Sequence, residues 1–292
     1  YWLYGLIVLA VIGIIFISDY VKQQTEPTKT LIYAEPVSPH VIPFTAMDEG
    51  FFKEENLTVI SQKFSAGRLA LDAVLTNNAQ FATMAETPFM HSVLQGNDVV
   101  IIATISEHKE TKAIARKDKG ILRSQDLRGK KIGTLPGTNS DYFMYIFLQS
   151  NNLSPKDVQI VSMSPPEMVA SLVRGDIDAF FAWEPHIFFA KKELGNNFII
   201  FEPGELYNGT HNVIMQRSFV EKNPETVNRL IKALLKAEVF VKQNRERSIE
   251  ITVNHTGVSK EALNEIYDDY RYEVKLDQSL IELLDKEAEW AI

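Results

Sequence analysis

Short apolar segments of strand character alternate with segments of helical periodicity along most of this 292-residue chain. The run Val99–Ile105 is continuously apolar, as in a parallel strand that is buried on both faces. Gly67–Thr76 instead has apolar residues at helical spacing. Such alternation predicts a mostly parallel sheet with helices on both faces. Beyond Asn212–Gln216, the last predicted strand, we expect only helices, at Pro224–Gln243, Ser259–Tyr270 and Asp277–Trp290.

An internal repeat indicates that the alternation is divided between two similar units. Residues 75–88 read LTNNAQFATMAETP and residues 172–185 read LVRGDIDAFFAWEP, with 13 positions from Leu to Pro and four identities. Both run from a helix end through a polar turn and a strand to the next helix. Because ligands of open α/β sheets bind beyond the carboxyl ends of strands, two facing units would place Glu86-Thr87 and Trp183-Glu184 on opposite walls of one cleft.

Composition argues against several classes of function. The formal net charge is −8, whereas a nucleic-acid binder needs a basic face. The chain has no cysteine, which removes disulfides, thiolate metal sites, iron–sulfur clusters, cysteine nucleophiles and a lipid-modified N-terminal cysteine. Its six histidines are scattered, without a pair at helical metal spacing, so we expect neither a metal site nor a cofactor. Generic hydrolase signatures are absent as well.

The N-terminal residues form an almost unbroken apolar run, Leu3–Ser18, which Asp19 ends. The run is slightly shorter than the roughly 20 residues of a spanning helix, although Tyr1 and Trp2 are suited to a membrane interface. It is interpreted as an uncleaved anchor over residues 1–20, as the apolar part of a secretory signal, or as a buried core helix. The first two interpretations place the remainder outside the cytoplasm, after a polar linker at residues 21–29.

Five motifs occur in a characteristic order. They are residues 50–57 (GFFKEENL), 126–133 (DLRGKKIG), 136–140 (PGTNS), 175–179 (GDIDA) and 183–185 (WEP). In order and spacing the chain resembles the periplasmic binding proteins of the aliphatic-sulfonate, nitrate and taurine type, which are related to the thiamine-pyrimidine synthases. The resemblance runs from about Leu31 to the end. It departs at Asn77–Gln80, where the family usually has a Gly and an Asp, and at the C-terminus, where relatives often continue.

The resemblance implies a two-lobed α/β fold, the type II periplasmic binding protein fold with hinge strands, here preceded by an N-terminal hydrophobic helix. We expect lobe 1 to comprise residues 30–112 and 213–292, and lobe 2 residues 113–212. The hinges would lie near Lys112–Arg116 and Asn212–Gln216, and ligand would select the closed form. The implied partners are a small-molecule ligand and the permease of an ABC importer, at the periplasmic or extracellular face of the cytoplasmic membrane.

The start of the helix at residues 137–140 is the best candidate for an anion site. Gly137 allows close backbone approach, and Thr138, Asn139 and Ser140 are good N-cap residues. Exposed amides at a helix N-terminus attract anions, although a plain capped helix has the same pattern. Opposite it, Trp183 could stack on a ligand and Glu184 could pair with an amine; alternatively they pack in the core and cap the next helix.

The remaining candidates lie on the loops that follow the predicted strands. Glu86 and Thr87 are the first-lobe counterparts of Trp183-Glu184, and Thr87 either donates to ligand or caps a helix. The cleft rim would comprise Ser38, His40 and Phe44, although His40 is equally consistent with a solvated loop. Two residues flank the Gly-containing loop before the last strand and would cover the ligand on closure: Tyr207 and His211.

These features favour a transport receptor that binds a small organic ligand and does no chemistry on it. An anionic or zwitterionic ligand resembling a sulfonate, nitrate, taurine or a vitamin precursor is expected. One alternative is the input domain of a membrane-bound sensor, which would use the same binding event. Another is a pyrimidine-synthase-like enzyme, but that group relies on a cysteine-rich iron motif and this chain has no cysteine.

Overall fold

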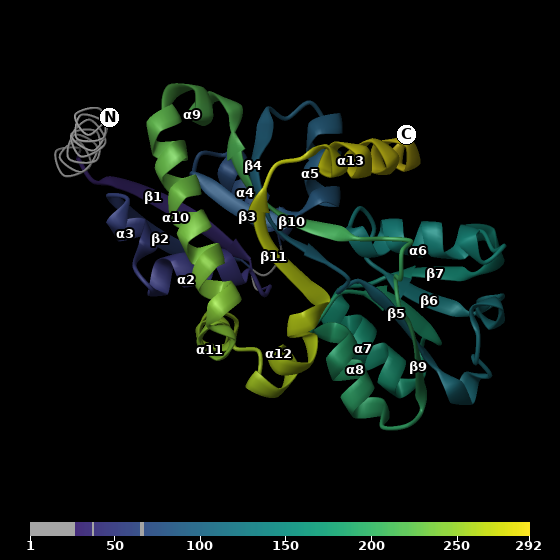
Figure 1. The fold of residues 1–292 in the computed structure, drawn as a ribbon. Helices are drawn as coiled ribbons and strands as arrows, with labels where there is room; N and C mark the ends of the chain where they lie inside the picture. The colour runs from purple at the N-terminus through teal and green to yellow at the C-terminus, as the bar shows by residue number, and fades with distance from the viewer. Residues whose placement is uncertain (1–26, 37, 65–66) are drawn as a thin grey trace, which may run out of the picture.

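The computed structural model describes residues 27–36, 38–64 and 67–292, arranged as two β-sheets with flanking helices (Figure 1). The first sheet has six strands in the order β11-β4-β10-β3-β1-β2. Their bounds are β1 Lys29–Pro36, β2 Leu57–Phe64, β3 Phe81–Ala85, β4 Val99–His108, β10 Gly209–Gln216 and β11 Tyr270–Lys275. The second has five in the order β7-β6-β8-β5-β9. Their bounds are β5 Lys112–Arg116, β6 Lys131–Thr134, β7 Gln159–Ser162, β8 Ala179–Ala182 and β9 Phe198–Phe201.

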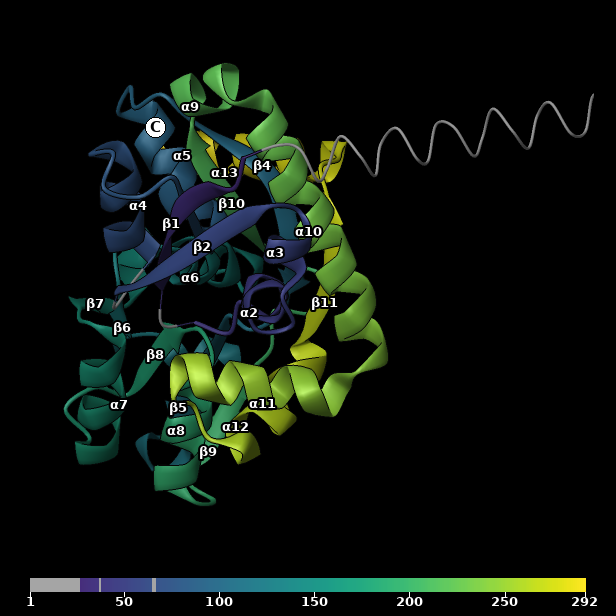
Figure 2. The same cartoon turned by 90° about the vertical axis from the view of Figure 1, so that its left-hand side faces the viewer.

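Helices cover both faces of each sheet, as Figures 1 and 2 show. Around the first sheet lie α2 Val41–Asp48, α3 Phe51–Glu54, α4 Gly67–Leu75, α5 Glu86–Leu94, α9 Arg217–Lys222, α10 Pro224–Gln243, α11 Arg245–Thr256, α12 Lys260–Ile266 and α13 Gln278–Ala291. Around the second lie α6 Asn139–Ser150, α7 Pro165–Arg174 and α8 His186–Leu194. Short 3-10 turns occur at η1 Lys117–Lys119, η2 Ser124–Leu127, η3 Pro155–Asp157 and η4 Tyr267–Asp269.

The central strands are buried on both faces because successive side chains point to opposite sides of a sheet. In β8, Phe181 joins the apolar cluster that contains α6, while the adjacent Phe180 joins the cluster on the α7 and α8 side. In β10, Val213 and Ile214 are divided in the same way between the two clusters of the first sheet. This division explains why these strands are apolar at nearly every position.

The two sheets repeat one arrangement, as the internal sequence repeat predicted. In the first, β3 lies between the parallel strand β1 and the antiparallel strand β10. In the second, β8 lies between the parallel strand β6 and the antiparallel strand β5. The repeated residues 75–88 and 172–185 therefore occupy equivalent positions in the two sheets.

The chain passes between the sheets in two short segments. Residues 109–111 lead from β4 to β5, and residues 202–208 lead from β9 back to β10. The C-terminal helix α13 forms a further connection, since its Leu284 packs against the first-sheet cluster and its Leu283 and Trp290 pack against the second. We call residues 109–111 and 202–208 the crossover segments.

Two predictions about strands are wrong. The strand predicted as parallel at Val99–Ile105 is β4, which pairs antiparallel with both β10 and β11. Its continuous apolar character reports burial on two faces and not strand direction. The chain is also not helical to its end after residue 216, because β11 follows η4. The alternation of buried Tyr270 and Tyr272 with exposed Arg271 has the period of a strand.

The predicted N-terminal hydrophobic helix, with the run Leu3–Ser18, lies outside the described residues. Within residues 27–292, no helix of the described part combines the length and apolar character required to cross a bilayer.

Truncation of Phe181 is expected to destabilise the second lobe strongly. This side chain is fully buried and makes edge-on contacts with Phe143 and Phe147, at ring-centroid distances of 5.6 and 5.5 Å. Phe181→Ala should lower the free energy of unfolding by about 3–5 kcal/mol, measured by urea denaturation. The control Phe189→Ala truncates a ring that is 37% exposed and should cost much less. Equal losses would contradict the assigned core.

Candidate functional site

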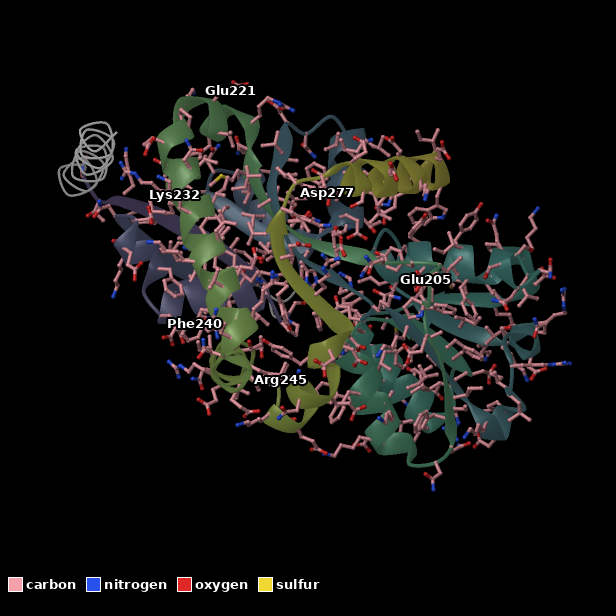
Figure 3. The ribbon with its side chains drawn as sticks, viewed as in Figure 1. Glu205, Glu221, Lys232, Phe240, Arg245 and Asp277 are labelled. Atoms are coloured by element: carbon pink, nitrogen blue, oxygen red, sulfur yellow. The ribbon has the colours of Figure 1, made fainter. Side chains whose placement is uncertain are left out.

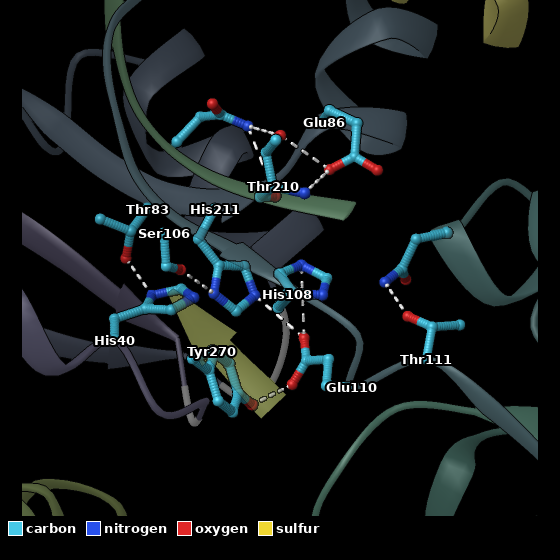
Figure 4. Close-up of polar contacts among 12 residues, drawn as sticks. His40, Thr83, Glu86, Ser106, His108, Glu110, Thr111, Thr210, His211 and Tyr270 are labelled. Carbon is cyan, nitrogen blue, oxygen red and sulfur yellow. Dashed lines mark hydrogen bonds and ion pairs between the residues drawn. The ribbon is translucent and has the colours of Figure 1, made fainter. Parts of the chain in front are cut away.

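Loops and helix starts from the two sheets meet around the crossover segments. Gly137, which follows β6, lies beside His91 on α5, so close that an added Cβ would stand 3.7 Å from the imidazole. Asn139 on α6 donates a hydrogen bond of 2.8 Å to the hydroxyl of Thr111. Figure 4 shows the buried polar side chains of this region. The structure therefore brings together both halves of the predicted cleft, with much of it buried.

Three histidines and one carboxylate form the centre of this region, which we call the histidine cluster: His40, His108, Glu110 and His211 (Figure 4). All four are buried. Glu110 Oε1 lies 3.1 Å from His211 Nε2 and 3.6 Å from His108 Nε2. The His40 ring lies 4.3 Å from that of His211, centroid to centroid, and its Nδ1 contacts the hydroxyl of Thr83. Sequence reasoning identified His40 and His211 but missed His108 and Glu110.

The protonation of this cluster follows from its burial. Burial lowers the pKa of His108 to about 4, although the Glu110 carboxylate opposes the shift. Burial by itself would raise the pKa of Glu110, but the two histidines and the Tyr270 hydroxyl together lower it to about 2. At pH 7 a neutral His108 imidazole therefore faces an ionised Glu110 carboxylate.

A second buried network surrounds Glu86 at the start of α5. Its carboxylate accepts hydrogen bonds from the backbone amide of Thr210 at 2.7 Å and from the Thr210 hydroxyl at 3.0 Å. The Tyr207 hydroxyl donates to the same carboxylate. Thr87 donates to Glu287 of α13 at 2.7 Å, and burial beside Glu86 raises the pKa of Glu287 well above its ordinary value. Glu86, Thr87 and Tyr207 thus hold the crossover and the C-terminal helix in place.

On the second lobe, Glu184 is held by two partners. Its carboxylate lies 3.3 Å from Lys112 Nζ and accepts a 3.0 Å hydrogen bond from the Phe188 amide, which is the helix-capping role considered above. Burial raises the pKa of Glu184 to about 7 against the opposing charge of Lys112. Trp183 is half-buried, outside the apolar clusters of the described residues, and it contacts the ring of His186 edge-on.

The start of α6 has the backbone expected for close approach. Gly137 has a φ of 73°, in the left-handed region that favours glycine. Its amide donates to Asp141 Oδ2 at 3.0 Å. The Thr138 hydroxyl donates to the Leu135 carbonyl at 2.6 Å and lies 2.9 Å from the Ser140 hydroxyl. Several polar groups at this helix start are therefore already paired within the loop.

Phe44 does not join the other candidates. Sequence reasoning placed it on the cleft rim with Ser38, but residues 41–48 form helix α2. Phe44 is fully buried there and stacks on His255 at 4.4 Å. Ser38, in contrast, remains on the partly exposed loop between β1 and α2.

A hollow of about 310 Å³ opens between the two lobes beside this buried region. Its first-lobe lining includes Arg68 and Asp72 of α4 and His91 of α5, and Pro136 and Gly137 line it from the second lobe. Arg68 is exposed, and no hydrogen bond or ion pair joins it to another residue of the described part. Of these residues, only Gly137 was predicted from the sequence to contact ligand. Arg68 lies near the start of a predicted helix, and a cation at that position could have identified it as a further candidate.

Comparison with known proteins gives one family and several relatives. The family model described as NMT1/THI5 like matches residues 38–248. The taurine-binding periplasmic protein of Escherichia coli (strain K12) is 27% identical over 192 residues, which cover 65% of this chain and 60% of that protein. The chain thus aligns with less than two thirds of this relative's length.

Two solved structures have the same fold. The periplasmic aliphatic sulphonate binding protein SsuA from Escherichia coli superimposes with a TM-score of 0.80 at 17% identity, covering 90% of this chain and 91% of that one. The desulfurization enzyme DSZB superimposes with a TM-score of 0.65 at 17% identity, and the match covers 90% of this chain and 91% of that one. At such identities the likeness concerns the fold alone, and it confirms the two-lobed α/β architecture predicted from the sequence.

The buried carboxyl group of Glu184 predicts a pH-dependent stability. Because its folded pKa, about 7, exceeds its ordinary value of 4.5, the folded state holds the proton more tightly. The protonated Glu184 contributes fully to stability below pH 4.5, and this contribution is lost as pH rises towards 7. Over that range the free energy of unfolding should fall by at most about 1.4 kcal/mol per pH unit. Glu184→Gln should flatten the free energy of unfolding between pH 4.5 and 7, measured by denaturation at each pH.

The matched control is Glu202→Gln, which removes an exposed carboxylate 3.7 Å from the same Lys112 ammonium. Equal flattening in both variants, or none in Glu184→Gln, would contradict the assigned role of Glu184.

Proposed function

The chain belongs to the NMT1/THI5-like family, and from this premise we propose that it is the solute-binding component of an ABC importer. It would bind a small organic anion or zwitterion between its lobes and would do no chemistry on it. The taurine-binding relative is a periplasmic binding protein, which supports this class of function. The absence of cysteine also argues against the iron-dependent synthases of the same superfamily.

The hollow between the lobes carries the proposal. Both lobes line it, so an occupying molecule would contact α4 and α5 on one side and residues 136–137 on the other. A ligand that contacts both lobes favours their closed arrangement over an open one, because only the closed arrangement offers all the contacts. Its volume of about 310 Å³ is at the lower end of the range for small-molecule pockets.

The charges of the hollow favour an amino-sulfonate or a similar zwitterion. The guanidinium of Arg68 presents several fixed N–H donors, which suit a planar or tetrahedral oxyanion. Asp72 lies four residues along α4, on the same helical face, and can accept from an ammonium group. The left-handed Gly137 lets the ligand approach the backbone on the opposite side.

The sequence-predicted residues extend this site into the buried junction. We propose that opening of the lobes would expose Ser38, His40, Glu86, Thr87, Thr138, Asn139, Ser140, Trp183, Glu184, Tyr207 and His211 along the cleft. The lobe boundaries predicted from the sequence, at 112/113 and 212/213, fall inside β5 and β10. Lobe 1 would instead comprise residues 30–108 and 209–292, and lobe 2 residues 112–201, with the crossover segments between them. We place the bending in the crossover segments, because β5 and β10 are each paired along their length within one sheet.

The proposed partner is the permease of the importer, and the proposed location is the outer face of the cytoplasmic membrane. The apolar run Leu3–Ser18 would direct export, either as an anchor that stays attached or as a signal that is removed. Fractionation of expressing cells separates these two, since only an anchored protein sediments with membranes.

Isothermal titration calorimetry with taurine, an alkanesulfonate and nitrate tests the ligand class. We expect one sulfonate-type compound to bind with a 1:1 ratio. Arg68→Gln should weaken it about 10- to 150-fold, which corresponds to the loss of roughly 1.5–3 kcal/mol for a charged hydrogen bond. The control Arg174→Gln changes an exposed arginine of α7 that pairs with Asp176, and it should bind as the wild type does. Absence of binding by all three compounds, or equal effects of both variants, would refute the proposal.

A further inference from the structure

The histidine cluster has the composition and spacing of a transition-metal site. Within the described residues, His108, Glu110 and His211 form a group in which each offers one ligand atom, and these atoms lie within 4.8 Å of one another. A tetrahedral Zn²⁺ with bonds of about 2.0–2.1 Å would hold its ligand atoms about 3.3–3.4 Å apart. The observed separations of 3.1 and 3.6 Å from Glu110 Oε1 to the two Nε2 atoms fall on either side of that value.

His108 provides a second, independent observation. His108 is 1% exposed, and neither of its ring nitrogens makes a hydrogen bond of good geometry in the described part of the chain, although the Thr210 backbone is near enough to raise its pKa slightly. A buried polar group without a partner is costly, and a metal ion at Nε2 would supply one. Gly209 lies against this ring, since an added Cβ would stand 2.5 Å from His108 Cε1. The backbone thus leaves room for this imidazole at the cluster.

The outer atoms of the other two residues are engaged in the way that metal ligands usually are. Glu110 Oε2 accepts a hydrogen bond from the Tyr270 hydroxyl, which leaves Oε1 directed at both histidines (Figure 4). His211 Nδ1 lies 3.3 Å from the Ser106 hydroxyl, which leaves Nε2 on the side of Glu110. Such outer hydrogen bonds orient ligating groups in known metal sites.

From these contacts we propose that His108, Glu110 and His211 bind a divalent transition-metal ion, Zn²⁺ in preference to Ca²⁺ or Mg²⁺. Two imidazoles and one carboxylate suit zinc, and three protein ligands leave a fourth position open. Glu110 lies in one crossover segment, His108 ends the strand before it, and His211 lies just after the other segment. A bound ion would therefore tie both connections between the lobes. This proposal does not depend on the nature of the organic ligand.

The test is a metal titration of the full chain without a polyhistidine tag and without any sulfonate. We expect Zn²⁺ to bind with a 1:1 ratio and to raise the melting temperature, while Ca²⁺ does neither. Co²⁺ in the same site should give the visible absorption bands of tetrahedral coordination, and Zn²⁺ should displace it. His108→Ala and Glu110→Gln should each weaken Zn²⁺ binding more than 100-fold, beyond the 10- to 100-fold typical of outer-sphere changes.

Glu205→Gln is the matched control, because this carboxylate lies in the other crossover segment (labelled in Figure 3). Its side chain is 98% exposed and pairs with Lys109. This variant should bind Zn²⁺ as the wild type does. Circular dichroism checks that each variant is folded. If a variant does not fold, the Co²⁺ spectrum of the unaltered chain tests the site instead: absence of tetrahedral absorption bands would refute it. Absence of a 1:1 site, or Zn²⁺ binding that survives both cluster substitutions, would overturn the proposal whatever the result with sulfonates.

Discussion

The junction of the two lobes depends most on the ion pairs that the ammonium group of Lys112 makes with three carboxylates. This ammonium group lies 3.3 Å from Glu184, 3.7 Å from Glu202 and 2.7 Å from Asp269. These carboxylates belong to the turn after β8, to a crossover segment and to the η4 turn before β11. One cation thus joins three segments that are distant in the sequence. Removal of the Lys112 ammonium would leave the buried carboxylate partners without a compensating charge. Loss of one partner of a buried ion pair costs about 3–5 kcal/mol of folding free energy, so we expect substitutions at Lys112 to destabilise the junction.

Local patterns predicted much of the fold, because strands such as β8 are apolar on both faces and helices such as α7 and α10 have a clear apolar periodicity. The repeat at residues 75–88 and 172–185 even predicted equivalent positions in the two sheets. The direction of a strand could not be predicted from its sequence, because an apolar run such as that of β4 is compatible with both parallel and antiparallel pairing. The strand β11 was missed because its alternating Tyr270 and Tyr272 follow a helix without a strong turn signal.

The site was predicted less completely, and the reason lies in the topology. Glu86 and Asn139 follow predicted strands, so the carboxyl-end rule identified them. His108 and Glu110 meet His211 only because β4 and β10 are neighbours, although about a hundred residues separate them along the chain. A search for histidine pairs at helical spacing cannot detect such a group. Phe44 was misplaced for a different reason: the chain enters helix α2 directly after His40.

The two proposed sites differ in exposure, and this difference suits different tasks. The hollow beside Arg68 is open, so its charges can exchange water for a ligand at modest cost. The histidine cluster is buried among fixed partners, where electrostatic interactions are stronger but the groups cannot rearrange freely. Ligand binding at the first would favour one arrangement of the lobes. A metal ion at the second would restrict the crossover segments through which the lobes move, and it would thereby set how readily the two arrangements interconvert.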